Sequence, residues 1–328
     1  MARKFECYYG ESGSGKSSAA AAMIAKLYQE NGKPFRVCVG DGSAATYEDC
    51  GLVDAGAVEI VDYTMRDWPL STLKQLMEGY WPLAPEDPRS KLHPMEPDDY
   101  DKIGGYIIEG LSVGSAYIMG DRKGGLAERS GRGEKIGQDS PIRVVDVEVD
   151  SKGRPMENTG TGLAFGGNPL AHFNFVQARI RGLLQQSKSL PGLVIWTAHE
   201  KTAEDRMSGE KVIGPEAAGQ ALTASLPRDF NNTVHFALAS KKTGKKLDPH
   251  TGKQVENLDV EYRIYTRDHY DPDGLVFVRY KAVTRIADPS MMPLFLSGDK
   301  PGDAIQEYYE IIGKAREAAR TKLVKGVA

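Results

Sequence analysis

Cysteine is scarce in this sequence, which has three cysteines among its 328 residues. So few cysteines argue against a disulfide framework and for a reducing compartment. Cys7 and Cys38 fall within predicted core strands, where we expect each to be a small buried hydrophobe rather than a reactive thiol. The sequence also lacks any apolar run as long as a membrane span, and its first residues lack the apolar stretch of a signal peptide. We therefore expect a cytoplasmic protein with no membrane partner.

A strong excess of charge of one sign is missing as well. The 42 Lys and Arg residues nearly balance the 45 Asp and Glu residues, so the formal net charge is −3. A chain with this balance has no global attraction to nucleic acid, and any such binding must come from local basic patches. The composition, 40% hydrophobic and 27% charged, is typical of a globular protein, and the length suits one large α/β domain or two smaller ones.

Glycine, in contrast, is plentiful, and one glycine-rich segment carries a chemical motif. Residues 10–17 read GESGSGKS, a complete G-x-x-x-x-G-K-[ST] phosphate-binding loop. Its glycines let the backbone curl so that N–H groups point at the phosphates, Lys16 reaches the β- and γ-phosphates, and the Ser17 hydroxyl is a Mg²⁺ ligand. The predicted nucleotide-binding residues are Gly10, Glu11, Ser12, Gly13, Ser14, Gly15, Lys16, Ser17 and Ser18. The loop therefore predicts ATP and Mg²⁺ as cofactors.

The segments on either side of this loop suit a phosphate site. Residues 5–9 form a short β-prone run, and residues 17–30 have an Ala-rich helical pattern that ends before Gly32 and Pro34. A helix that leaves the loop adds the positive end of its dipole to the phosphate site. The sequence thus predicts a strand, the loop and a helix in succession.

Apolar, β-prone runs alternate with helical patterns over the first part of the chain. We expect strands at 5–9, 35–40, 57–61, 105–109 and 193–198, and helices at 17–30, 70–79 and 173–189. Strands that alternate with helices predict right-handed crossovers and a mostly parallel sheet. Later runs at 233–240, 261–266 and 275–282 are joined by turn-rich segments, which predicts an antiparallel extension of the sheet toward the C-terminus. The expected fold class is α/β, with helices flanking the sheet.

The predicted domain organisation is a core over residues 1–295 followed by a C-terminal helical tail over 296–328. Two insertions interrupt the core. The segment at about 81–101 is rich in Pro and acidic residues, and we expect an irregular surface loop there. The segment at about 120–167 begins with a Gly-rich basic stretch without hydrophobic period, and we expect a mobile loop there.

Carboxylates that could serve the phosphate loop follow several predicted strands. Glu109 ends one run and is the candidate second magnesium residue; it is one methylene longer than the usual Asp, so it would act through a water ligand. Asp62 is its main rival, and a strand-end Glu in solvent is the structural alternative. Asp41 directly follows another run and is the candidate for orienting the attacking water, with Glu48 as the alternative.

Two further features lie at a strand end and in loops. His199 follows the run that ends at Ala198, where a polar residue can contact the γ-phosphate; a satisfied structural histidine is the alternative. Two segments carry basic clusters that could contact nucleic-acid phosphates or could be ordinary solvated loops. The clusters consist of Arg122, Lys123, Arg129, Arg132 and Lys135, and of Lys241, Lys242, Lys245, Lys246 and Lys253.

The order of these features resembles the RecA-like ATPase core. More narrowly, the chain is similar to the phage nucleotide-binding ATPases related to RecA and RadA, which include single-strand-annealing ATPases. The similar pieces are the phosphate loop at 10–17, residues 107–112 (IIEGLS) in place of that group's I-[IV]-D-S-[LI]-[ST], the sensor strand at 194–199 (VIWTAH), Gly214-Pro215, Phe230 and residues 282–285 (AVTR) before an Asp-Pro turn. The resemblance implies a RecA-like P-loop NTPase core.

This resemblance also implies an ATPase that assembles head to tail into a homo-oligomeric ring or filament, with nucleotide at the subunit interface. The loops at 115–137 and 200–212 are then expected to face single-stranded DNA, in phage recombination or replication in the host cytoplasm. Arg285 is expected to reach a neighbour's γ-phosphate. The expected catalytic set is Lys16, Glu109, Asp41, His199 and Arg285, with Ser17 and Glu109 at the metal.

Two departures from that family leave other functions open. Glu109 stands where the family has Asp, and an Asp stands where a RecA core has its water-activating Glu, so a slow ATPase or a nucleotide-gated binder also suits the sequence. The alternatives are a DNA-packaging or translocating motor, a nucleotide-stabilised structural component of a phage particle, and a P-loop small-molecule kinase.

Overall fold

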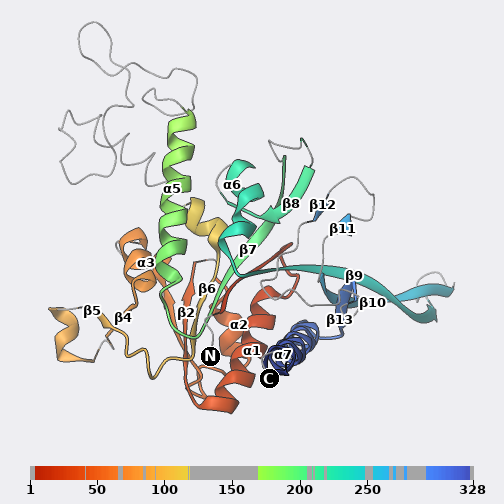
Figure 1. Cartoon of the computed structure of the whole chain (residues 1–328), viewed down its shortest axis with the longest axis horizontal. Coiled ribbons are helices and arrows are strands. Elements are labelled where there is room, and N and C mark those ends of the chain that lie inside the picture. Colours follow the sequence, from red (N-terminus) through yellow and green to blue (C-terminus); the bar gives the residue numbers. More distant parts are fainter. Residues whose placement is uncertain are drawn as a thin grey trace, which may run out of the picture.

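Figure 1 shows the computed structural model of the chain. It describes residues 4–40, 42–65, 69–83, 86–92, 94–116, 118, 169–204, 209, 211–217, 220–247, 254–265, 269–270, 277–278 and 293–325. The insertion at 120–167 and the candidate residues Asp41 and Arg285 lie outside the described residues, as does most of the predicted DNA-facing loop at 115–137.

One mixed β-sheet, flanked by helices on both faces, forms the centre of an α/β fold (Figure 1). Eight of its eleven described strands lie in the order β3 (Val58–Asp62), β2 (Phe35–Val39), β6 (Gly105–Ile108), β7 (Leu193–Glu204), β1 (Lys4–Gly10), β9 (Asn232–Leu247), β10 (Gln254–Tyr265) and β13 (Phe295–Gly298), and the other three form a branch from β7. All neighbouring pairs from β3 to β9 are parallel. β10 pairs antiparallel with both β9 and β13, which confirms the predicted antiparallel extension.

Successive side chains of β1 point to opposite faces of the sheet and belong to two hydrophobic layers. Cys7 and Tyr9 belong to one layer and Tyr8 to the other. The first layer is covered by α3 (Pro69–Met77), α5 (Pro169–Ser187) and α6 (Gln220–Ser225), and the second by α1 (Lys16–Asn31), α2 (Ala44–Asp49) and α7 (Pro301–Lys325). Coverage on both faces explains why the central strands are apolar along most of their length. Among the described helices, none combines the length and the apolar character that crossing a membrane requires.

Glycines set both ends of α1. Gly15 caps the N-terminus with φ 89°, and Gly32 caps the C-terminus with φ 66°, its N–H donating to the carbonyl of Tyr28. Both values lie in the left-handed region that residues with a Cβ rarely adopt. Between the caps the helix is rich in alanine, the best helix former, and small buried alanines let it pack closely on the sheet.

The predicted C-terminal helix is α7, which packs along α1 (Figure 1). Tyr308 is fully buried in the layer that this helix shares with α1. A buried polar cluster also joins α7 to the sheet: the Tyr309 hydroxyl donates to the carboxylate of Glu6 in β1, which accepts a second hydrogen bond of 2.9 Å from the Asn232 amide of β9. The C-terminal helix therefore contributes to the hydrophobic core beside the phosphate-loop strand.

The Pro-rich segment at 81–101 is more regular than predicted. Two short strands, β4 (Tyr80–Pro82) and β5 (Met95–Pro97), pair antiparallel within it. Asp98 follows β5, and its Oδ1 accepts a 2.8 Å hydrogen bond from Nη2 of Arg36 in β2. The prediction failed because this anchoring ion pair joins residues that are distant in sequence, which local composition does not reveal.

The segment at 200–212 also differs from the predicted loop. β7 runs on to Glu204 and pairs antiparallel with β8 (Lys211–Pro215), so most of the described part of this segment is a β-hairpin. The predicted run at 275–282 contributes β12 (Phe277–Val278), which pairs parallel with β8, so the prediction that this run extends the antiparallel edge is wrong. The remaining described elements are β11 (His269–Tyr270), a helical segment at 111–116 and three short 3₁₀ helices at Tyr63–Met65, Pro88–Lys91 and Leu226–Asp229.

Candidate functional site

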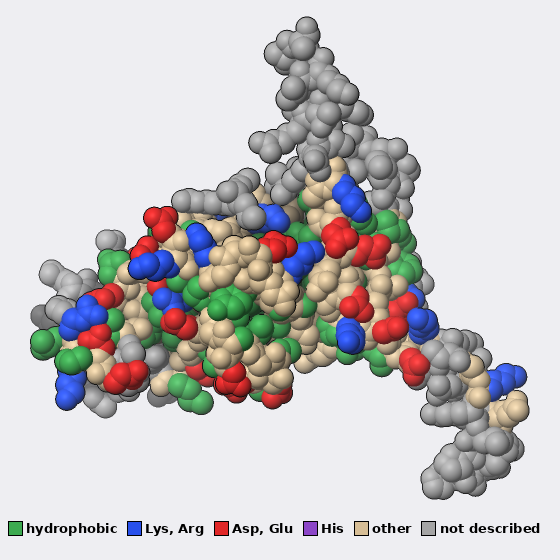
Figure 2. Space-filling model, turned by 90° about the horizontal axis from the view of Figure 1, so that it is seen from below, with side chains coloured by type: hydrophobic (Ala, Val, Ile, Leu, Met, Phe, Trp, Pro, Cys, Tyr) green, Lys and Arg blue, Asp and Glu red, His purple; other side chains and the backbone are tan. Residues whose placement is uncertain are grey.

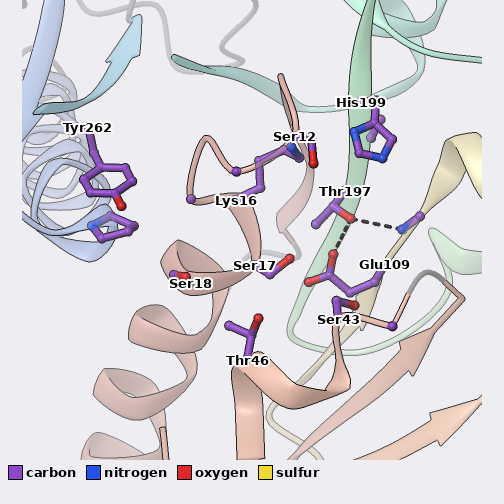
Figure 3. Close-up of a pocket in the computed structure, with 16 residues that line it drawn as sticks. Ser12, Lys16, Ser17, Ser18, Ser43, Thr46, Glu109, Thr197, His199 and Tyr262 are labelled. Atoms are coloured by element: carbon purple, nitrogen blue, oxygen red, sulfur yellow. Dashed lines mark hydrogen bonds between the residues drawn. The ribbon is translucent and has the colours of Figure 1, made fainter. Parts of the chain in front are cut away.

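The phosphate loop lies at the carboxyl end of β1, the edge of a parallel sheet at which ligands commonly bind (Figure 3). Gly13 adopts φ 78°, a conformation that glycine reaches without strain. Gly10 lies so close to β9 that an added Cβ would be 2.1 Å from the carbonyl oxygen of Phe236. The loop therefore requires glycine for its backbone conformation and for its packing against the neighbouring strand.

Lys16 is held inside the loop by the loop's own oxygen atoms. Its Nζ donates to the carbonyl of Gly10 at 3.0 Å, to the carbonyl of Glu11 at 2.7 Å and to the Ser14 hydroxyl at 3.4 Å. The side chain is buried and lines a cavity beside the loop. The predicted binding residues Glu11 and Ser14 thus contact the lysine, while Ser12, Gly13, Gly15, Lys16, Ser17 and Ser18 line the cavity.

This cavity has a volume of about 360 Å³, within the range of small-molecule sites. Four parts of the fold converge on it: the phosphate loop, the segment after β2, the carboxyl end of β6 with the middle of β7, and the start of α7 with the adjacent β10 (Figure 3). Glu109 and His199 both line it. The structure therefore brings together the predicted magnesium residue, the predicted γ-phosphate contact and the loop.

Glu109 directly follows β6 and is 1% exposed. The Tyr47 hydroxyl donates to its Oε1 and the Thr197 hydroxyl donates to its Oε2. Thr197 in turn accepts a 3.0 Å hydrogen bond from the N–H of Gly110. A buried carboxylate is costly unless it is hydrogen bonded, and these two hydroxyls supply that stabilisation. The alternative of a strand-end glutamate in solvent is therefore wrong.

The residues expected at a magnesium ion suit that ion chemically. The hydroxyl of Ser17 and the carboxylate of Glu109 line the same cavity. Mg²⁺ prefers such hard oxygen ligands and completes its octahedron with water and phosphate oxygens, so a site of few protein ligands is typical. Among the described residues, no group of three or more His, Cys, Asp or Glu side chains could hold a metal ion.

Asp62 and Glu48, the other acidic candidates, lie away from the cavity. Asp62 Oδ1 accepts hydrogen bonds from the Thr64 N–H at 2.8 Å and the Thr64 hydroxyl at 2.6 Å, so it caps the turn after β3. Glu48 is exposed on α2. Neither residue lines the cavity. Asp41 is outside the described residues, but Gly42 lines the cavity, so the segment that follows β2 does reach the site.

The backbone of His199 is fixed on both sides. Its N–H donates to the Ser112 hydroxyl at 3.1 Å, and its carbonyl accepts from the N–H of Glu216 at 2.6 Å. The first bond ties the middle of β7 to the segment that follows Glu109, and the second ties it to the residue after β8. The position of His199 in the strand is therefore set by both neighbouring segments.

Sequence reasoning missed several residues at this site, among them Thr197, Tyr47, Tyr262 and Pro301. Thr197 shares a strand face with His199, two positions away, and this alternation could have identified it. Tyr47, Tyr262 and Pro301 reach the site from α2, β10 and α7, far from the loop in sequence. No local pattern could identify these three, because only the packing of the fold brings them to the cavity.

Comparison with known proteins adds no family to this description. No protein-family model matches the chain, and no curated protein matches its sequence. What the site can do is therefore argued from its own residues.

Proposed function

We propose that this protein binds and hydrolyses ATP in a RecA-like P-loop core and that it acts on single-stranded DNA. One observation carries the proposal: the phosphate loop and the buried carboxylate of Glu109 line the same cavity, at the carboxyl edge of a mostly parallel sheet. A chance loop motif would not bring a second carboxylate to the same cavity. Hydrolysis of a nucleoside triphosphate needs both a phosphate cradle and a group that acts on the magnesium shell.

The strand order supports the RecA-like part of the proposal. β7, which leads to His199, lies directly between β1 and β6, and β6 lies between β7 and β2. The resemblance implies this neighbourhood, with the sensor strand beside the phosphate-loop strand and the magnesium-site strand next. The antiparallel strands that follow β9 agree with the extension expected toward the C-terminus.

Each side chain has a distinct task in this proposal. Lys16 stabilises the charge on the β- and γ-phosphates, and Ser17 with Glu109 holds the magnesium ion and its water shell. Bound Mg²⁺ neutralises charge on the phosphate oxygens. Thr197 and Tyr47 orient the Glu109 carboxylate, and His199 lies where contact with the γ-phosphate could be passed to the β7–β8 hairpin. The residue that orients the attacking water is proposed to be Asp41.

The proposed DNA surface lies beyond the end of β6 and along the hairpin of β7 and β8. The hairpin of β7 and β8 begins directly after His199 and carries the exposed residues Lys201 and Lys211. On the face shown in Figure 2, acidic and basic side chains of the described residues are interspersed, with no broad basic area. Head-to-tail assembly, with Arg285 acting on a neighbour's nucleotide, belongs to the same proposal.

One observation favours a second candidate, a nucleotide-stabilised structural component. Both carboxylate oxygens of Glu109 already accept hydrogen bonds within the protein. A carboxylate held in this way could retain magnesium and nucleotide without supporting rapid turnover. Retained ATP without measurable hydrolysis would favour this candidate.

Steady-state ATP hydrolysis tests the proposal. The rate is measured at low salt without DNA, with single-stranded DNA and with duplex. The proposal expects stimulation by single strands that declines as salt rises, because phosphate contacts are salt-dependent. A rate that is unaffected by DNA would contradict the DNA-binding part, and an absence of both hydrolysis and ATP binding would contradict the whole proposal.

A further inference from the structure

The cavity has two chemically different ends (Figure 3). One end is charged and hydroxyl-rich, with Lys16, Glu109 and Thr197. The other end is formed by the rings of Tyr262 and Pro301. A ligand made only of phosphates would use the first end alone, so the aromatic end indicates that the ligand also has an apolar part.

Both rings belong to elements outside the phosphate-loop motif. Tyr262 lies in β10, and Pro301 is the first residue of α7. They contact the loop at Gly15, where an added Cβ would lie 2.6 Å from Pro301 Cβ and 3.0 Å from Tyr262 Cδ1. The two rings are therefore packed directly beside the start of α1.

The loop fixes the direction in which a triphosphate lies. Lys16 would reach the β- and γ-phosphates, and a magnesium ion held by Ser17 and Glu109 would place the γ-phosphate on the Glu109 side of the loop. The α-phosphate and the group attached to it must then leave the loop on the opposite side. In Figure 3, Tyr262 lies on that side, across the loop from Glu109.

We propose that Tyr262 and Pro301 form the platform for the nucleoside of ATP, with the Tyr262 ring stacked on the base. This inference rests on the proposed nucleotide-binding function. Stacking on an aromatic ring accepts any base, because every base has a π-face. The backbone of Tyr262 is held between two strands, since the residue is paired in the sheet with Leu238 of β9 and with Gly298 of β13. A preorganised ring binds its ligand with little further loss of conformational freedom.

The test compares ATP with tripolyphosphate, which carries the phosphates but no nucleoside. Binding of each to the full chain is measured by titration calorimetry with Mg²⁺. Tyr262→Ala should weaken ATP binding by about tenfold to a hundredfold and change tripolyphosphate binding by less than about twofold. Tyr262→Phe should keep the affinity for both ligands. Tyr80→Ala, which removes a 39% exposed tyrosine from the β4–β5 hairpin, is the matched control and should change neither.

Each outcome separates the platform from the phosphate site. Unchanged ATP affinity in Tyr262→Ala, or equal losses for the two ligands, would overturn the platform and leave the proposed function standing. Failure of the unmodified chain to bind either ligand would overturn both. Tyr262→Trp provides a second readout: ATP should quench the added fluorescence and tripolyphosphate should not, and equal responses to the two ligands would contradict stacking.

Discussion

The two polar walls of the cavity are built in different ways. The phosphate loop is a single run of eight residues, held by glycine conformations and by bonds from Lys16 to its own carbonyls. The carboxylate wall is assembled from three distant segments, with Glu109 after β6, Tyr47 on α2 and Thr197 on β7. A local motif therefore sets where phosphates bind, and the tertiary fold sets how the carboxylate is presented.

This difference indicates that variants of the loop should affect nucleotide binding, whereas variants of the carboxylate wall should affect turnover. The loop acts through the backbone and one cation, so damage to it should remove binding. The carboxylate wall acts through buried hydrogen bonds, which can be changed one at a time. We expect its variants to alter magnesium dependence and rate more than nucleotide affinity.

The largest effect is expected from Lys16→Ala. Removing the cation at the phosphates should abolish measurable ATP binding and lower turnover by about a hundredfold to a thousandfold. Nucleotide titration and steady-state hydrolysis measure the two effects. Lys26→Ala, which removes a more exposed lysine from the same helix, is the control and should match the unmodified chain. Equal turnover in Lys16→Ala and the unmodified chain would show that the loop is not the nucleotide site.

Glu109→Gln should separate binding from hydrolysis. The neutral amide keeps the size of the side chain but weakens its hold on the magnesium shell, so turnover should fall about tenfold to a hundredfold while ATP still binds. Removing Mg²⁺ with a chelator should reduce the rates of both proteins to the same low level. Glu48→Gln, on the exposed face of α2, serves as the control. If turnover in Glu109→Gln is normal, the carboxylate wall has no catalytic task.

Tyr47→Phe should have a smaller effect of the same kind. The variant removes one hydrogen bond to Glu109 and keeps the buried ring, so the Mg²⁺ concentration for half-maximal activity should rise about threefold to tenfold. Tyr28→Phe removes a hydroxyl whose hydrogen bond to the Ala55 carbonyl is exposed, and should leave the Mg²⁺ dependence unchanged. A Tyr47→Phe protein with lower stability but normal Mg²⁺ dependence would mean that Tyr47 has a structural role only.

The smallest effect concerns the thiols. Burial raises the pKa of Cys7 and of Cys38 well above the usual range, so both remain protonated at neutral pH, whereas Cys50 is exposed. An alkylating reagent should therefore modify one thiol per folded chain, at Cys50, and three after denaturation. Mass spectrometry of the modified peptides counts them. Rapid modification of Cys7 in the folded chain would show that β1 is less protected than the structure indicates.

Much of the fold could be predicted because its signals are local. β1, β2, β3, β6 and β7 are apolar runs, and α1 and α7 show helical patterns. The β4–β5 hairpin could not be predicted, because its anchor is the pairing of Asp98 with Arg36 across the fold. The extension of β7 to Glu204 depends in the same way on pairing with β8.

The residues of the site also divide into those that could be identified from the sequence and those that could not. Its phosphate loop could be identified outright, because all its residues are contiguous. The choice of Glu109 over Asp62 depended on which strand ends beside β7, and the hydrogen bonds of Asp62 to Thr64 decide against the rival. Tyr47 and Tyr262 could not be predicted at all, because no motif near either residue in the sequence connects it with the phosphate loop. A contiguous motif and polar residues in apolar strand runs, such as Glu109 and His199, can be identified from sequence, whereas residues brought in from other elements, such as Tyr47 and Tyr262, cannot.

A crystal structure of the full chain with Mg²⁺ and a non-hydrolysable ATP analogue tests the central claim most directly. The account predicts phosphates against residues 12–17, the metal between Ser17 and the Glu109 carboxylate, and the nucleoside beside Tyr262. A nucleotide bound elsewhere, or phosphates in the loop with the metal remote from Glu109, would contradict the claim that this cavity is one composite nucleotide site.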